Sequence, residues 1–308
     1  MRTSRGTRGS GFVRDAVVPV RTPYRLDLTA VVLRRLSTNV VDVFDGTAYR
    51  RLVGDPDAPT LFSATQTAPG AITVRLDGPH AERFDPETLA RRLLGVDVDL
   101  RAFYAGAKTI PWLRALAAGA RGVKPPRYPS LWETACNAII YQQISIHAAG
   151  AILRRVIERY TRPAERDGMT LFPFPSTTTL LNAKPADLRA LGLSVNKINA
   201  LIAVGDAIAA NTLDEAALEQ LPTPALLDEL VAHKGIGPWT AAVIALRGFG
   251  RLDVFPMKDS GATALLRKLS GDDDAQAEPI LAALSPQQGM LYYHLLLGRL
   301  SATGEVTL

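Results

Sequence analysis

The sequence lacks the residues that build disulfide frameworks and metal clusters. It contains one cysteine, Cys136, among 308 residues. A disulfide within the chain is therefore excluded, and so are an iron–sulfur cluster and a cysteine-rich zinc site. A single thiol is typical of proteins in a reducing compartment, so we expect a cytoplasmic protein.

Long hydrophobic runs are also missing. No apolar segment approaches the roughly 18 residues that a membrane-spanning helix needs, so we expect no membrane partner. Apolar residues nevertheless make up 47% of the chain, which argues against wholesale disorder and allows a sizeable core. The formal net charge of +5 is mildly basic, which suits a polyanionic partner without proving one.

The N-terminal segment 1–21 has few apolar residues before residue 12 and several basic ones. Arg2, Arg5, Arg8 and Arg14 stand among small polar residues, without the long apolar core of a secretory signal. We expect a flexible basic tail, either merely solvated or adding non-specific contacts to phosphates.

Residues 22–105 predict an α+β lobe in which strands precede a helix. The segment 24–36 opens with alternating apolar and polar residues, which predicts a strand. Two β-prone runs flank Pro69 and Gly70, which predicts a hairpin. The segment 85–95 has an acidic first turn and ends in glycine, which predicts a helix.

From residue 106 to 308 the pattern is helical almost throughout. Residues 131–161 form one long apolar-periodic segment, and shorter helical segments follow between proline-rich and glycine-rich connections. The predicted fold class is therefore α+β. An N-terminal antiparallel sheet with helices packs on an all-α domain.

Two glycines interrupt the apolar helices of this second domain. The stretch HKGIGPW places Gly235 and Gly237 between two predicted helices, so that 223–248 reads as a helix–hairpin–helix. Glycines permit a tight turn and the close approach of a ligand. The free amides of the two glycines and of Thr240 are candidate phosphate donors at a helix N-terminus, and Ile236 is a candidate apolar plug. An ordinary turn between helices explains the glycines equally well.

An acidic residue opens the next predicted helix, in the segment 253–269. Asp259 stands 20 residues after Trp239. By itself such an acid reads as a helix cap. A glycine hairpin followed by Val-Phe-Pro and a capping acid is, however, an unusual combination.

These residues resemble a known family. The stretch KGIGPWTAAVIALRGFGRLDVFPMKD is similar to the hairpin, loop and aspartate of the helix–hairpin–helix (HhH-GPD) DNA glycosylases. Within that superfamily the resemblance is strongest to the bacterial 3-methyladenine DNA glycosylase II group. It covers nearly the whole chain from about residue 22.

The resemblance implies a catalytic role for Asp259, which would stabilise an oxocarbenium-like transition state. Trp239 occupies the position at which bifunctional relatives carry a lysine nucleophile, so a monofunctional enzyme without a lyase step is implied. Lys234 and Lys258 lie nearby without matching that position. Trp239 would instead bind the base, or else be a core residue, and Tyr141 is a second base-binding candidate.

The resemblance also implies contacts away from the reaction. Gln143 matches the residue that fills the gap left by a flipped nucleotide, although it also reads as a solvent-facing helical residue. The carbonyls of Val231, His233 and Ile236 match positions that hold a structural Na⁺ or K⁺. No cofactor is implied for catalysis. The implied partner is double-stranded DNA with damaged bases, bound by a monomer in the bacterial cytosol or nucleoid.

The chain departs from the pattern in its base pocket. Val243 and Gln287 stand where aromatic residues are expected, and Tyr141, Tyr292 or Tyr293 could compensate. The leading hypothesis is excision of alkylated purines of the 3-methyladenine type. Excision of hypoxanthine, ethenoadenine or an oxidised purine stays open, as does a non-catalytic DNA-binding protein. A helical scaffold would leave the hairpin and Asp259 unexplained.

Overall fold

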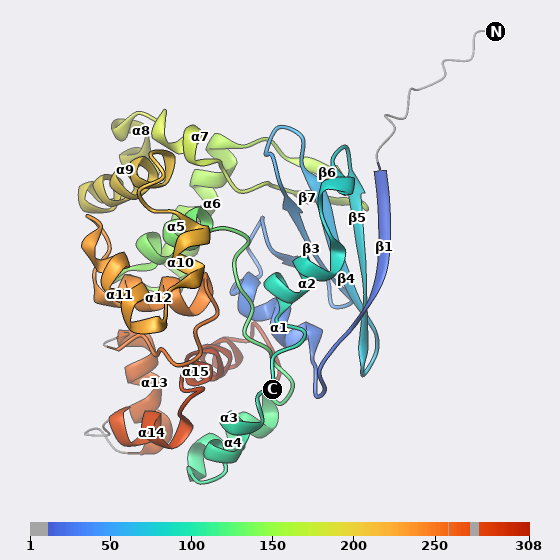
Figure 1. Cartoon of the computed structure of the whole chain (residues 1–308), viewed down its shortest axis with the longest axis vertical. Coiled ribbons are helices and arrows are strands. Elements are labelled where there is room, and N and C mark those ends of the chain that lie inside the picture. Colours follow the sequence, from blue (N-terminus) through green and yellow to red (C-terminus); the bar gives the residue numbers. More distant parts are fainter. Residues whose placement is uncertain (1–11, 258, 272–276) are drawn as a thin grey trace, which may run out of the picture.

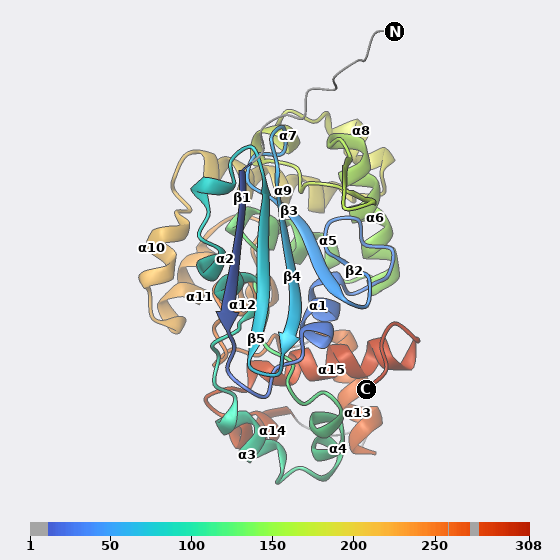
Figure 2. The same cartoon turned by 90° about the vertical axis from the view of Figure 1, so that its right-hand side faces the viewer.

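A computed structural model describes residues 12–257, 259–271 and 277–308. A five-stranded antiparallel sheet stands at one side and helices fill the other (Figure 1). Its strand order is β1-β5-β4-β3-β2, and no helix of the described residues covers the face of the sheet that Figure 2 turns toward the viewer. The strands are β1 (Phe12–Pro19), β2 (Val43–Phe44), β3 (Ala48–Val53), β4 (Thr60–Ala68) and β5 (Ala71–Gly78).

The first strand corrects the predicted tail. Residues Phe12–Pro19 pair with β5 from Phe12 opposite Gly78 to Pro19 opposite Ala71. The flexible tail predicted over 1–21 is therefore wrong for this strand, and residues 1–11 lie outside the described residues. As an edge strand, β1 leaves most of its side chains exposed, so backbone pairing rather than an apolar pattern defines it.

The strand predicted at 24–36 is also wrong, because this segment forms α1 (Leu26–Arg34). Seven of its residues are buried. One side of α1 packs under the sheet through Leu26 and Leu33, and the other packs on the C-terminal helices through Leu28 and Val32. A helix buried on both sides lacks the one-sided periodicity by which helices are identified.

The other expectations for the lobe are confirmed. Strands β4 and β5 form the hairpin around Pro69 and Gly70. Helix α2 (Pro86–Leu94) begins after Asp85, whose side chain accepts a hydrogen bond from the Thr88 amide, and ends at Gly95 in the left-handed conformation. A short 3-10 turn, η1 (Ala81–Arg83), precedes it.

Helices make up most of the remaining chain, which confirms the α+β class. They are α3 (Arg101–Ala107), α4 (Pro111–Gly119), α5 (Leu131–Tyr141), α6 (Ile146–Tyr160), α7 (Thr177–Leu181), α8 (Pro185–Ala190), α9 (Val195–Ala209), α10 (Glu215–Gln220), α11 (Thr223–Ala232), α12 (Pro238–Arg247), α13 (Ser260–Ser270), α14 (Ala277–Leu284) and α15 (Gly289–Ala302). In the described ranges, no helix has both the length and the apolar character to cross a bilayer.

Two details of the helical region differ from the prediction. The long segment 131–161 is two helices, because α5 ends at Tyr141 and α6 starts after the capping residue Ser145. The region is also not entirely helical. A hairpin of β6 (Ala164–Arg166) and β7 (Met169–Leu171) turns at Asp167 and Gly168, which both have positive φ. Such a two-residue Asp-Gly turn is favoured in hairpins.

Candidate active site

The predicted helix–hairpin–helix is present as α11, a short turn and α12. Its two glycines have different roles. Gly235 has φ +95°, and a Cβ there would come within 2.8 Å of the Ala200 backbone. Gly237 has φ −88° and open space where a Cβ would stand. The first glycine is required by the fold, whereas the second leaves an exposed backbone approach at the start of α12.

The turn is held by Ile236, which is buried in the helical core and is therefore the predicted apolar plug. The Ile236 amide donates to the His233 carbonyl at 3.1 Å. Among the described residues, no backbone amide donates to the carbonyls of Val231 or Ile236. Neutral oxygens with free lone pairs at a helix end suit a monovalent cation, so the residues present fit the Na⁺ or K⁺ of the prediction.

Asp259 is fixed from two sides. One carboxylate oxygen caps α13 and accepts from the Ala262 amide at 2.8 Å. The other accepts from the indole Nε1 of Trp239 at 3.1 Å. Trp239 sits in the first turn of α12, so this hydrogen bond joins the hairpin directly to the acid.

These two side chains face one cavity of about 450 Å³. Its walls are formed by residues of α5, α12, α13 and α15, by the turn between α5 and α6, and by the residue that follows α1. Of the predicted site residues, the cavity brings together Asp259, Trp239, Tyr141, Gln143, Gly237 and Thr240. Gly235, Val231, His233 and Ile236 do not line it.

The break between α5 and α6 forms one rim of the cavity. Gln143 is exposed there with φ +56°, so it projects from a turn and not from a helix. Its neighbour Ile144 is 39% exposed, a rare position for a large apolar residue in this chain, and sequence reasoning did not single it out. Gln142 donates to the Thr240 hydroxyl, which ties this rim to α12.

Thr240 is buried. Its amide stays a predicted phosphate donor, but the exposed Gly237 is the better placed of the predicted donors. Lys234 lies in the exposed part of the turn, and Lys258 lies outside the described residues.

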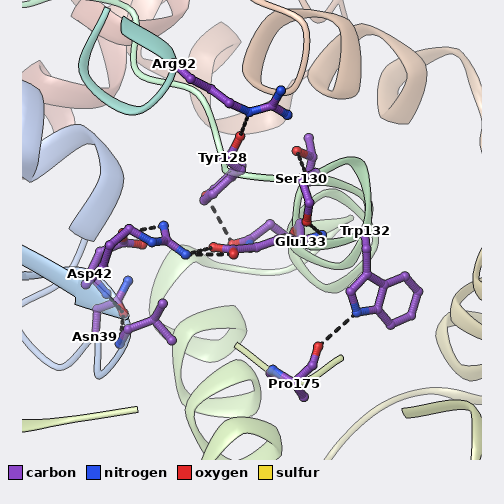
Figure 3. Close-up of polar contacts among 12 residues, drawn as sticks. Asn39, Asp42, Arg92, Tyr128, Ser130, Trp132, Glu133 and Pro175 are labelled. Carbon is purple, nitrogen blue, oxygen red and sulfur yellow. Dashed lines mark hydrogen bonds and ion pairs between the residues drawn. The ribbon is translucent and has the colours of Figure 1, made fainter. Parts of the chain in front are cut away.

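A buried ion network anchors the opposite end of α5 to the sheet (Figure 3). Arg51 on β3 donates to Asp42 at 2.9 Å and to both oxygens of Glu133, the closer at 2.7 Å. Tyr49 also donates to Asp42 at 2.6 Å. Burial raises the pKa of Glu133, and the Arg51 guanidinium opposes that shift. The network fixes the helix that carries Tyr141 at its other end.

The cavity lining also includes two arginines and a tyrosine, and sequence reasoning gave the two arginines no role. Arg35 follows α1, while Arg299 and Tyr292 lie on α15. Tyr292 was only a possible substitute for a missing aromatic residue. No local signal marks the two arginines, because they lie about 260 residues apart in the chain and meet only in the fold.

Gln287 was expected to occupy the base pocket in place of an aromatic residue, and this expectation is wrong. Its side chain accepts from the Phe103 amide at 2.9 Å and donates to the Asp99 carbonyl at 2.5 Å. It therefore joins the start of α15 to α3 and does not line the cavity. Val243 does line the cavity. Tyr293 is buried outside it, with its hydroxyl near the Leu246 carbonyl.

Comparisons with known proteins agree with this geometry. A model of the HhH-GPD superfamily of base excision DNA repair proteins matches residues 136–286. The structure is similar to the 3-methyladenine DNA glycosylase of Archaeoglobus fulgidus, with a TM-score of 0.76 and 22% identity over 92% of this chain and 98% of that one. At 22% identity, the similarity to the Archaeoglobus fulgidus structure shows a shared fold.

Two curated relatives are similar in sequence. A Mycobacterium tuberculosis protein, described as a probable bifunctional transcriptional activator/DNA repair enzyme AlkA, is 32% identical over 82% of this chain and 50% of its own length. DNA-3-methyladenine glycosylase 2 of Escherichia coli is 31% identical over 46% of this chain and 50% of its own. The chain spans about half the length of the curated relatives it matches. With the hairpin, the capping aspartate and the matched family model, the chain belongs to the HhH-GPD superfamily of base excision DNA repair proteins.

Proposed function

We propose that this protein is a monofunctional DNA glycosylase that excises alkylated purines and leaves an abasic site. The observation that carries the proposal is Asp259, held by the Trp239 indole and the start of α13 at the wall of a base-sized cavity. The names of the relatives, DNA-3-methyladenine glycosylase and DNA repair enzyme, support the same reaction class.

The reaction begins with a flipped nucleotide, because a base inside the duplex cannot reach the cavity. Gln143 and Ile144 stand exposed at the rim, where they fill the space that the base leaves in the stack. Gly237 and the N-terminus of α12 bind a backbone phosphate, and such contacts position the enzyme without reading sequence. The carbonyls of Val231, His233 and Ile236 in the hairpin would hold a Na⁺ or K⁺, which would supply positive charge for binding the DNA backbone.

The base then enters the cavity beside Trp239, Tyr141 and Tyr292. As the N-glycosidic bond breaks, positive charge develops on the sugar, and the fixed carboxylate of Asp259 stabilises it. Water attacks the sugar carbon and loses a proton, for which Asp259 is the acceptor. The bond from sugar to base breaks, its electrons leave with the base, and water supplies the new hydroxyl.

Hydrolysis without strand cleavage is proposed because Trp239 cannot form a Schiff base. Among the described residues, no lysine lines the cavity. Incubation of the protein with lesion-bearing duplex should therefore leave abasic sites uncut until alkali is added. Strand cleavage without alkali would contradict the monofunctional proposal.

The decisive experiment compares the wild type with Asp259→Asn on alkylated duplex DNA, with released bases measured by chromatography. We expect the variant to lose at least about 100-fold in rate while still binding DNA. Asp253→Asn is the matched control, because Asp253 is an exposed acid in the preceding loop. Wild type that releases no base would refute the enzyme and leave a DNA-binding protein. An Asp259→Asn variant as active as wild type would refute the role of the acid.

A further inference from the structure

Arg35 enters the cavity from an unexpected part of the chain. It is the residue after α1, and its φ of +58° is uncommon for any residue other than glycine. Its amide donates to the Val31 carbonyl at 2.7 Å, which holds the backbone in this conformation. The chain turns sharply at this point, and the side chain lines the cavity instead of continuing along the helix. Such local strain is often found at functional sites.

The guanidinium of Arg35 is buried without a counter-charge. The residue is 4% exposed, and its Cζ lies 4.0 Å from the centre of the Tyr141 ring. Within the described residues it forms no ion pair with a carboxylate, and its Nη1 has no hydrogen-bond partner. Burial lowers the pKa of Arg35, but the surrounding tyrosines raise it by more. The net pKa is above its ordinary value, so the guanidinium stays charged.

Other buried arginines are satisfied differently. Arg51 has two carboxylate partners. Arg247 has none among the described residues, but it donates to the Val32 carbonyl and does not line the cavity. Arg35 therefore stands apart as an unpaired buried cation at the cavity wall.

The cavity carries a positive balance. Its charged lining residues within the described part of the chain are Arg35, Arg299 and Asp259, which sum to +1 (two cations minus one carboxylate). Charges act strongly on each other where water is excluded. Arg35 also occupies one face of Tyr141 and draws on the electron density of that ring, which weakens the ring's attraction for a second cation on its other face.

We propose that Arg35 makes this cavity select neutral damaged bases over cationic ones. This inference rests on the proposed glycosylase function. Purines methylated at N7 or N3 are cations in DNA, whereas ethenoadenine and hypoxanthine are neutral. The charge of Arg35 repels the cationic methylated purines and does not repel the neutral bases. Ethenoadenine, an alkylated yet neutral adenine, is the expected preferred substrate.

The test compares two duplexes that differ in the charge of one base, ethenoadenine or 7-methylguanine. Single-turnover excision rates are measured for wild type, Arg35→Met and Arg35→Lys and corrected for spontaneous release. Methionine keeps the apolar stem without the charge, and lysine keeps the charge. We expect the ratio of the ethenoadenine rate to the 7-methylguanine rate to fall about tenfold or more in Arg35→Met. In Arg35→Lys it should stay within about threefold of wild type.

Three outcomes would overturn the inference. The first is a folded Arg35→Met protein whose ratio of ethenoadenine to 7-methylguanine excision rates equals that of wild type. The second is a fall in this ratio in Arg35→Lys as large as that in Arg35→Met. The third is a wild type that excises 7-methylguanine faster than ethenoadenine. If Arg35→Met fails to fold, Arg35→Gln takes its place, since glutamine also removes the charge.

Failure of the proposed function is distinguishable from failure of this inference. A wild type that excises neither base and also releases none from alkylated duplex DNA would refute the glycosylase. Binding of the same duplexes by Asp259→Asn, with and without Arg35→Met, then decides the role of Arg35. A preference for the neutral lesion that Arg35→Met abolishes supports it, and equal affinities overturn it.

Discussion

Two buried arginines, Arg51 and Arg35, lie at opposite ends of helix α5. Arg51 is 1% exposed, and carboxylates meet both its terminal nitrogens. Arg35 is 4% exposed, and its nearest partner is the face of the Tyr141 ring. Arg51 joins strand β3 to Glu133 near the start of α5, and Figure 3 labels Glu133 and Asp42, its two carboxylate partners. Arg35 lines the cavity at the other end of α5.

The difference separates residues that hold the fold from residues that meet a ligand. A buried charge with its partners in place is costly to break, because removal of one member leaves the others uncompensated. Removal of a buried charge that has no charged partner leaves no other buried charge uncompensated. Such a charge at a cavity wall interacts mainly with the ligand that enters the cavity.

The largest expected effect comes from Arg51→Met compared with Arg35→Met. Arg51→Met leaves Asp42 and Glu133 buried without their cation, so we expect a loss of about 3–5 kcal/mol in the free energy of unfolding. Arg35→Met should cost much less, because no carboxylate loses a partner. Denaturant unfolding of both variants measures the difference. Equal losses would remove the distinction between the two arginines.

A second prediction concerns a buried polar group that is only half satisfied. The Nδ1 of His294 donates to the Met290 carbonyl at 2.8 Å, while its Nε2 meets no partner among the residues that the structure describes. Burial lowers the pKa of His294 to about 4. In the unfolded chain His294 therefore binds a proton near pH 6.5, whereas in the folded protein it stays neutral until about pH 4. The free energy of unfolding decreases as the pH falls from 6.5 toward 4.

This loss should amount to up to about 3 kcal/mol for His294 alone. Unfolding free energies at both ends of the window measure it. His294→Asn keeps a donor for Met290 without titrating and should flatten the decline, whereas the exposed His147→Asn should not. A decline that is identical in wild type and His294→Asn would exclude the buried imidazole as its cause.

The two hairpin glycines give the same contrast on a smaller scale. Gly235→Ala forces a side chain into positive φ against Ala200, so we expect a loss of about 2 kcal/mol in stability. Gly237→Ala meets open space and should leave stability almost unchanged. It should weaken DNA binding, because a methyl group then stands at the start of α12. Thermal unfolding and a binding titration separate the two. A stable Gly235→Ala protein would contradict the assignment.

The smallest effect is expected from Trp239→Phe. Phenylalanine keeps an aromatic wall but removes the N–H that holds Asp259 at 3.1 Å. Asp259 keeps its cap to Ala262, so we expect a decrease of about tenfold in the excision rate, not its loss. Single-turnover kinetics at saturating enzyme measure it. An unchanged rate would mean that the α13 cap alone positions the acid.

Sequence reasoning predicted the parts whose chemistry is local. The hairpin glycines, the start of α12 and the capping position of Asp259 each depend on a few neighbouring residues. For the same reason Gly95 and the Pro69-Gly70 turn were identified correctly. The errors at β1 and α1 have the opposite cause. An exposed edge strand and a helix buried on two sides owe their conformation to what packs beside them.

The sequence by itself determined the helix–hairpin–helix and the acid beyond it, because turn and cap preferences act within one or two helical turns. Tertiary structure alone decided that Trp239 donates to Asp259, that Gln287 leaves the cavity and that Arg35 enters it. Those contacts join residues 20 to more than 180 positions apart. Which side of a buried helix meets which neighbour depends on how all the cores pack together, and no local pattern of residues encodes that choice.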